Sequence, residues 1–383
     1  MQINLRKMLY KIVSLLLIIL FAAGSMAYAD PAEPIAKAAI LVEADTGEVL
    51  YRYNDNTKLP IASVTKIMTL CLIFDAIDAE KLSYDDVVTV SKNASNMGGS
   101  QVFLENGGKY KAQDLIKSII IASANDACVA MAEHLEGSQQ NFVSKMNSKA
   151  KELEMNGTKF VNCTGMPADG HFSTAYDVAI MSRELLKHDD FYKYSSIWMD
   201  KIEHSKGRIT ELTNTNKLVR FFDGCDGVKT GYTDEAGHCI SATVSKNGMR
   251  LISVIIGGQT SQQRFDDARR LINYGFDTYT LVDLLDNVEI PKSISVEGGM
   301  DKEIEIIPGS GAKAILKRDD EKKIKFRVEI PKSVKAPIHK GETVGELIFE
   351  QDGKVIAKIN MISAQEGNKA TLGEYFNKLI ERW

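Results

Sequence analysis

The sequence predicts an α+β fold, in which a cluster of helices packs on an antiparallel sheet and a small all-β domain follows. Two observations predict it. Segments with helical periodicity lie between an opening hairpin pattern and closing strand patterns, and the pattern changes to strand alternation after Phe276. A chain of 383 residues also suits two domains better than one. We therefore expect domains at 30–277 and 278–368, with terminal segments at 1–29 and 369–383.

Hairpins open and close the first domain. The opening hairpin turns at the Asp-Thr-Gly sequence of 45–47, and the closing one turns at Asn247-Gly248. Runs rich in Val, Ile and Leu flank both turns, as strands require. The predicted strands are residues 40–42, 49–51, 228–233, 238–244 and 251–256.

Three helices are predicted between these hairpins. The first follows Pro60 and has apolar residues at i, i+3, i+4 and i+7, counted from Ile67. The second has its apolar face at 115–120 and ends near Ser123.

The third helix passes through 130–135, and we expect Asn125 and Asp126 to cap its N-terminus. The stretch 162–173 contains Gly and Asp and no helical or strand periodicity. We expect it to form an ordered loop.

The second domain is predicted from alternation. Residues 324–330 alternate apolar and polar, and so do 345–361 about a turn at Asp352-Gly353. The segment contains no cluster of His, Cys and Asp and no nucleophile with a plausible base. We expect it to be a spacer or an interaction module.

The first 29 residues have the features of a secretory signal peptide. Arg6, Lys7 and Lys11 form a basic start, residues 12–23 are apolar, and the small-x-small pattern at 27–29 suits a signal peptidase. A retained membrane anchor is the alternative, but the run is short for a hydrocarbon core of about 30 Å. We expect secretion across the cytoplasmic membrane and an extracytoplasmic location.

Charge and cysteine content limit the partners of the chain. Removal of residues 1–29 takes away three basic residues and no acidic one, so the formal net charge changes from −4 to −7. Such a chain lacks the clustered Lys and Arg that nucleic acids need. Five cysteines remain, none in a CxxC pair, and the odd number excludes a complete disulfide framework. We expect buried free thiols.

A Ser-x-x-Lys pattern at Ser63 and Lys66 lies at the start of the first helix. Three residues apart on a helix, the two side chains share one face and are within hydrogen-bond reach. A serine hydroxyl needs a neighbour that takes its proton, and a desolvated neutral lysine can do so. The pattern alone is weak, because Ser148 and Lys151 match it too.

Two further motifs accompany Ser63. A Ser-x-Asn motif at 123–125 lies between two predicted helices, where side chains can turn into a cleft. A Lys-Thr-Gly motif at 229–231 lies on a predicted strand, and Gly231 would let a substrate backbone approach closely. The three motifs in this order are typical of class A β-lactamases and penicillin-binding proteins.

The mature sequence resembles, over essentially its whole length, the low-molecular-mass D-alanyl-D-alanine carboxypeptidases of the penicillin-binding protein 5 and sporulation carboxypeptidase group. The resemblance implies a β-lactamase/transpeptidase-like catalytic domain. It also implies a serine-type D-Ala-D-Ala carboxypeptidase that trims peptidoglycan stem peptides in cell-wall biogenesis and is acylated by β-lactams. Further matching segments lie at 41–47, 98–101, 173–177 and 336–341.

The resemblance implies a role for each motif residue. Ser63 would be the nucleophile that forms the acyl ester, and Lys66 would accept its proton. Ser123 would relay a proton to the leaving D-alanine, while Asn125 would bond the substrate amide.

The third motif is implied to bind the substrate terminus. Lys229 and Thr230 would hold the terminal carboxylate, and backbone N–H groups of Ser63 and Tyr232 would form the oxyanion hole. Tyr232 departs from penicillin-binding protein 5, which has histidine there, and this puts side-chain effects on rate and pH dependence in question.

Two alternative functions remain open. A β-lactamase would share fold and acylation, but Ala124 stands where β-lactamases usually have aspartate, and the loop 162–173 contains Asp169 as its only acid and no glutamate. A catalytically silent wall-binding protein would have no need of an intact Ser63 and Lys66. The motif residues therefore favour the carboxypeptidase over both alternatives.

The same residues need neither metal nor cofactor. Lys66 and Lys229 would share one cleft, where burial and mutual repulsion lower a lysine pKa towards that of a general base. No HxxxH pair and no Gly-rich phosphate loop are present, so we expect no cofactor. For His171 and His238 we expect surface or hydrogen-bonded roles.

The C-terminus predicts an amphipathic helix. Its apolar side chains recur at helical spacing, with basic residues near them, which suits the surface of a membrane. A helix docked on the β domain is the alternative. The apolar residues are Leu372, Tyr375, Phe376, Leu379, Ile380 and Trp383.

Overall fold

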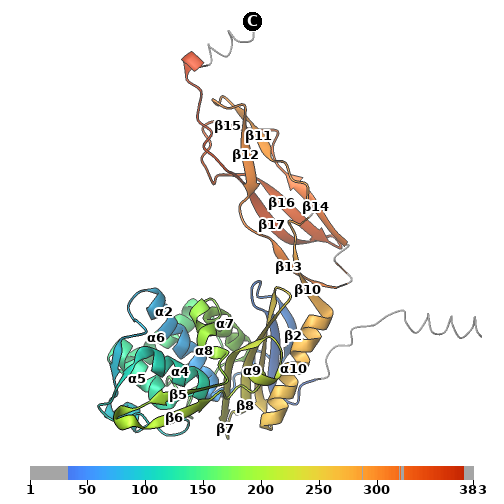
Figure 1. Ribbon diagram of the computed structural model, residues 1–383. Coiled ribbons are helices and arrows are strands. Elements are labelled where there is room, and N and C mark those ends of the chain that lie inside the picture. Colours follow the sequence, from blue (N-terminus) through green and yellow to red (C-terminus); the bar gives the residue numbers. More distant parts are fainter. Residues whose placement is uncertain (1–32, 287, 319, 321–322, 375–383) are drawn as a thin grey trace, which may run out of the picture. The chain divides into compact units, whose positions relative to one another are not determined.

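The structure is a computed structural model that describes residues 33–286, 288–318, 320 and 323–374 (Figure 1). The predicted signal peptide lies outside the described residues. So does most of the predicted C-terminal helix. Its first turn is described, and Thr371 and Glu374 hydrogen-bond each other there as in a helix N-terminal capping box.

A five-stranded antiparallel sheet in the order β2-β1-β9-β8-β7 forms the centre of the first domain. Both predicted hairpins are present. Asn247 and Gly248 have φ of 52° and 77°, which a tight hairpin turn needs. The strands are β1 (Ala38–Glu43), β2 (Val49–Tyr53), β7 (Cys225–Thr233), β8 (Gly237–Lys246) and β9 (Met249–Gly258).

Strand β1 is buried on both of its faces. Ala38, Ile40 and Val42 belong to one apolar core, whereas Ala39 and Leu41 belong to another. Because successive strand residues point to opposite faces, the sheet separates two cores.

A helical cluster covers the first of these faces (Figure 1). Its main helices include the three predicted ones, and the second ends at Ser123 as expected. The cluster comprises η1 (Ala62–Thr65), α2 (Lys66–Asp78), α4 (Ala112–Ala122), α5 (Asn125–Glu136), α6 (Gln139–Glu152) and α7 (Ala175–Leu185).

Helix α10 (Ser261–Thr278) covers the opposite face of the sheet (Figure 1). This helix was not predicted from the sequence. Its signals are present, since Thr260 and Gln263 form a capping box and Phe265, Ala268 and Leu271 are buried at helical spacing.

Shorter elements complete the first domain. Two small antiparallel sheets pair β3 with β4 and β5 with β6. The bounds are β3 (Val87–Thr89), β4 (Lys109–Lys111), β5 (Met199–Glu203), β6 (Ile209–Thr213), α3 (Lys92–Ser95), α8 (Tyr192–Ser195), α9 (Leu218–Phe221), η2 (Asp189–Phe191) and η3 (Ser205–Gly207).

The second domain is all-β, as predicted, with its own apolar core. Strands β10 (Tyr279–Asp283) and β13 (Lys313–Lys317) form a pair. A six-stranded sheet has the order β14-β16-β17-β12-β11-β15. Its strands are β11 (Ser293–Glu297), β12 (Glu303–Pro308), β14 (Ile324–Glu329), β15 (Ser333–Lys335), β16 (Thr343–Gln351) and β17 (Lys354–Ser363).

The predicted N-terminal caps of α5 are found only in part. Helix α5 begins at Asn125, and its N-cap residue, Ala124, makes no side-chain hydrogen bond. The prediction for Asn125 is wrong, because its side chain bonds other partners, described below. The Asp126 carboxylate accepts the N–H group of Ala127 in the first turn, at 3.0 Å. It also accepts the backbone N–H groups of Val102 and Leu104, at 3.1 and 3.0 Å, and so holds a neighbouring loop.

The cysteines and the apolar content of the helices bear on two further expectations. All five cysteines are buried and free, as predicted. Among the helices of the described ranges, none is long and apolar enough to cross a membrane.

Candidate active site

Ser63 and Lys66 lie where the short helix η1 runs into α2. Ser63 is within η1, and Lys66 is the first residue of α2. Ala62, just before the serine, has a φ of 47°, an unusual conformation for a residue with a side chain. The turn leaves Ser63 partly accessible, while the Lys66 side chain is fully buried.

The amine of Lys66 has three polar neighbours. Its Nζ lies 2.8 Å from Ser63 Oγ, 2.6 Å from Asn125 Oδ1 and 2.6 Å from the backbone oxygen of Thr164. The amide oxygen and the carbonyl can only accept hydrogen bonds. A neutral amine has two N–H groups for them, and its lone pair then faces the Ser63 hydroxyl. The geometry therefore fits a neutral amine poised to take the serine proton.

Burial favours this neutral form. It lowers the pKa of Lys66 from its ordinary value, against smaller opposing effects from Cys128, Cys163 and Asp126. Burial also lowers the pKa of Lys229 well below its ordinary value, and the nearby Lys66 acts in the same direction. Repulsion from Lys66 thus contributes to the lowered pKa of Lys229, whereas burial is the cause for Lys66.

Asn125 reaches the Lys66 amine from the start of α5, and Ser123 lies two residues before it, at the end of α4. Ser123 ends α4 in the left-handed conformation, and its Oγ is buried without a hydrogen-bond partner among the described residues. An orphan hydroxyl of this kind costs stability and indicates a group held for a ligand. Asn125 donates from Nδ2 to the Gly98 carbonyl at 2.7 Å.

The Lys-Thr-Gly motif lies on the edge strand β7. Lys229 and Thr230 are buried, and Lys229 Nζ donates to the Thr230 carbonyl at 3.1 Å. A Cβ added to Gly231 would lie 2.8 Å from the backbone nitrogen of Ser63. The packing of β7 against Ser63 within the chain therefore requires this glycine. From the sequence, the glycine was expected instead to admit a substrate backbone.

Tyr232 extends past the motif to the surface. Its ring is half exposed and stacks on the His238 ring, with centroids 4.4 Å apart. Its hydroxyl donates to Asp234 Oδ1 at 2.7 Å. The side chain is thus held beside the site.

The loop 162–173 was predicted to be ordered, but its contribution to the site was missed. It supplies the Thr164 carbonyl to Lys66. His171 anchors the loop: its Nδ1 accepts from Val161 N, and its Nε2 lies 2.8 Å from Thr65 Oγ1. Burial lowers the pKa of His171 to about 4, so it is neutral and hydrogen-bonded, as expected. A backbone carbonyl has no signature in sequence, which explains the omission.

The second Ser-x-x-Lys match lacks this environment. Ser148 and Lys151 lie on α6 and are exposed. The Ser148 hydroxyl donates to the Ser144 carbonyl at 3.0 Å. Without burial and converging partners, the pattern has no chemical role.

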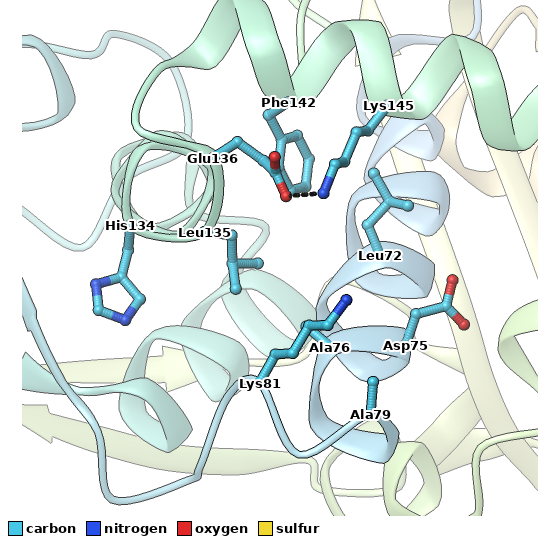
Figure 2. Close-up of a pocket in the computed structure, with 10 residues that line it drawn as sticks. All are labelled: Leu72, Asp75, Ala76, Ala79, Lys81, His134, Leu135, Glu136, Phe142 and Lys145. Atoms are coloured by element: carbon cyan, nitrogen blue, oxygen red, sulfur yellow. Dashed lines mark hydrogen bonds and ion pairs between the residues drawn. The ribbon is translucent and has the colours of Figure 1, made fainter.

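A cavity of about 220 Å³ lies elsewhere in the helical cluster, between α2, α5 and α6 (Figure 2). It adjoins Asp75 and Ala79, at the end of α2 opposite Lys66. The close-up shows Lys81 extending towards it and an ion pair between Glu136 and Lys145 at its edge. No serine, threonine or cysteine is among its lining residues, so it does not compete with Ser63 as a site for acyl transfer.

Fold and site together define a transpeptidase-like serine hydrolase. Residues 25–260 match the family of D-alanyl-D-alanine carboxypeptidases, peptidase S11, and residues 276–369 match the C-terminal domain of penicillin-binding protein 5. The chain belongs to the D-alanyl-D-alanine carboxypeptidase family and is a serine D-Ala-D-Ala carboxypeptidase.

Individual relatives agree over most of the chain. The D-alanyl-D-alanine carboxypeptidase DacF of Bacillus subtilis is 39% identical over 349 residues, which are 91% of this chain and 90% of the relative. DacA of Escherichia coli is 32% identical over 360 residues, 90% of this chain and 86% of the relative.

Solved structures confirm the predicted fold of a transpeptidase-like domain followed by a β-rich domain. Penicillin-binding protein 5 from Haemophilus influenzae superposes with a TM-score of 0.78 at 27% identity, covering 89% of this chain and all of that one. Penicillin-binding protein D2 from Listeria monocytogenes, solved in an ampicillin-bound form, covers 64% of this chain and 100% of its own at 31% identity, with a TM-score of 0.58.

Proposed function

We propose that the enzyme removes the terminal D-alanine from peptidoglycan stem pentapeptides through an acyl-enzyme on Ser63. The observation that carries the proposal is the short contact of Ser63 Oγ with a buried lysine amine whose N–H groups have other acceptors. A nucleophile next to a group that can take its proton is the arrangement that acyl transfer needs.

Lys66 takes the hydroxyl proton as Ser63 Oγ attacks the carbonyl between the two D-alanines. The resulting oxyanion is stabilised by the backbone N–H groups of Ser63 and Tyr232. Ser123 passes the proton to the departing amine, the peptide bond breaks, and free D-alanine leaves. Water then hydrolyses the ester and restores the serine.

Lys229 and Thr230 bind the substrate's terminal carboxylate. Lys229 is buried, and burial and the nearby Lys66 lower its pKa, so a bound carboxylate would favour the protonated form of Lys229 and be stabilised by its charge. Asn125 binds the substrate amide. Since its Nδ2 is bonded to the Gly98 carbonyl in the free enzyme, substrate must displace or share that contact.

The rest of the proposal concerns location. Residues 1–29 would direct export, the catalytic domain would span 30–277, and the β domain at 278–368 would act as a spacer. The helix at 369–383 would hold the enzyme at the outer face of the cytoplasmic membrane. The capping pair of Thr371 and Glu374 supports a helix start there.

A β-lactamase function would require fast hydrolysis of the acyl-enzyme. Penicillin-binding protein D2 from Listeria monocytogenes was solved in an ampicillin-bound form, which supports β-lactam binding by this chain as well. The loop beside Lys66 has no glutamate that could activate water.

Release of D-alanine from a stem pentapeptide tests the function. The protein without residues 1–29 is incubated with the pentapeptide, with a tetrapeptide as control, and free D-alanine is measured. We expect one D-alanine per pentapeptide and none from the tetrapeptide. Rapid turnover of penicillin without release of D-alanine would instead establish the β-lactamase.

A further inference from the structure

The orientation of Lys66 depends on a backbone atom outside the three motifs. The Thr164 carbonyl lies 2.6 Å from Nζ and takes one of the two N–H groups of the neutral amine. If this acceptor moved, the amine could rotate, and its lone pair would no longer face Ser63. What fixes the Thr164 carbonyl therefore matters for the proposed proton transfer.

The side chain of Asn162 builds the turn that holds this carbonyl. Its Oδ1 accepts from Thr164 N at 3.1 Å, from Thr164 Oγ1 at 3.1 Å and from Gly165 N at 2.7 Å. Its Nδ2 donates to the Met166 carbonyl at 2.9 Å. One side chain thus fixes three consecutive residues, as Asn does in tight turns.

The turn is also packed against the segment that carries the nucleophile. Gly165 has a φ of 81°, and a Cβ there would lie 1.9 Å from the Ala62 carbonyl oxygen. Just before the turn, the Cys163 carbonyl accepts from Thr69 Oγ1 of α2 at 2.6 Å. The turn therefore connects α2 to the residue preceding Ser63, and it has little room to shift.

We propose that Asn162 is a positioning residue for the general base: it fixes the Thr164 carbonyl, and through it the direction of the Lys66 lone pair. The inference rests on the proposed role of Lys66. It predicts that loss of the Asn162 side chain harms acylation more than loss of another asparagine that holds the chain just before this loop.

Asn147 provides that matched control. It bonds both the N–H and the C=O of Phe160, each at 2.9 Å, and so fixes the chain shortly before the loop without touching the acceptor of Lys66. The variants are Asn162→Ala, Asn147→Ala and Asn162→Ser. The serine is a neutral, shorter acceptor that can retain part of the turn.

Acylation by a fluorescent penicillin is measured for each variant from pH 5 to 10, together with its melting temperature. For Asn162→Ala we expect a rate lower by about 10- to 100-fold, because misplaced groups lose catalysis steeply. The acid limb should also move to higher pH, since water admitted to Lys66 would reduce the burial that lowers its pKa. Asn162→Ser should lie between this variant and the native enzyme.

Asn147→Ala should lower the melting temperature and leave the acid limb in place. If Asn162→Ala keeps the native acid limb and loses no more rate than Asn147→Ala, then Asn162 is merely structural and the inference is wrong. Failure of the proposed function would look different, because the native enzyme would then release no D-alanine from the pentapeptide.

Discussion

At the scale of single residues, the chemistry depends on which hydrogens each group has available. Ser63 contacts one amine, and that amine has two acceptors of its own. Ser123 contributes a buried hydroxyl with no partner among the described residues. The amine beside Ser63 and the unpartnered hydroxyl of Ser123 are therefore the two groups on which the proposed proton transfers depend.

Replacement of the nucleophile is the most direct test of this arrangement. Ser63→Ala should abolish both D-alanine release and covalent labelling by penicillin, because one hydroxyl serves both reactions. The fold should be retained, since the side chain is small and partly exposed. Mass spectrometry of the variant after incubation with penicillin checks this, and a penicilloyl adduct would refute the assignment of Ser63.

The buried amine of Lys66 should make the acylation rate fall at low pH. Burial lowers its folded pKa below the unfolded value of about 10.4, so the neutral base persists to lower pH than in a free lysine. Acylation should fall as pH drops through that lowered pKa. The contribution of neutral Lys66 to the free energy of unfolding is fully present above the unfolded pKa. It is lost as the pH falls through the folded pKa, because protonation of the buried amine is then costly. A rate that stays flat from pH 5 to 9, with acylation limiting, would contradict the assignment.

The motif residues were predictable because each contributes a distinctive side chain at a fixed spacing. Ser63, Lys66 and Asn125 meet around one amine, although 59 positions separate Lys66 from Asn125. The Thr164 and Gly98 carbonyls were not predictable, since every residue has a carbonyl and only the folded loop selects these two. For Asp126 the sequence indicated the bond to the start of its own helix but not the bonds to a distant loop, which depend on tertiary packing.

At the scale of elements, the site is a junction between the edge strand β7 and the turn that starts α2. The hairpins and the first helices follow from periodicity and turn residues. Helix α10 was not predicted, although the capping box of Thr260 and Gln263 marks its start. The close approach of β7 to Ser63 could not be predicted, since it depends on how two distant segments pack.

Gly231→Ala tests this junction. A Cβ 2.8 Å from Ser63 N must push the strand and the turn apart, so acylation should fall about 100-fold and stability by about 1–3 kcal/mol. Gly311→Ala is the control, since a Cβ there meets nothing within 4 Å. Penicillin acylation rates and urea unfolding of both variants provide the measurement. An unaffected acylation rate in Gly231→Ala would show that the junction tolerates displacement.

At the scale of the whole molecule, the catalytic groups described above all lie before residue 260, and the β domain has a separate core. The sequence predicted this two-part organisation because the alternation after Phe276 is regular. It could not predict the six-stranded order, which pairs β11 with β15 in parallel.

Removal of the predicted C-terminal helix distinguishes a helix on the membrane surface from a helix docked on the β domain. A chain that ends at Ala370 should lose membrane association while its melting temperature and its activity on a soluble peptide stay unchanged. A docked helix would instead bury apolar area that contributes about 25 cal/mol per Å², so its removal would lower stability. Vesicle flotation and thermal melting distinguish the two. A melting temperature several degrees lower, in a protein whose full chain never binds vesicles, would rule out the membrane reading.

The central position of β1 has a consequence for the biogenesis of the enzyme. This strand is among the first described residues, yet it must pair with β9, roughly 200 residues later, before either core can close. A nascent chain that has emerged only as far as α7 therefore has no completed sheet to lock it. If the chain is exported as proposed, we expect it to remain unfolded during export and to fold once β9 has emerged.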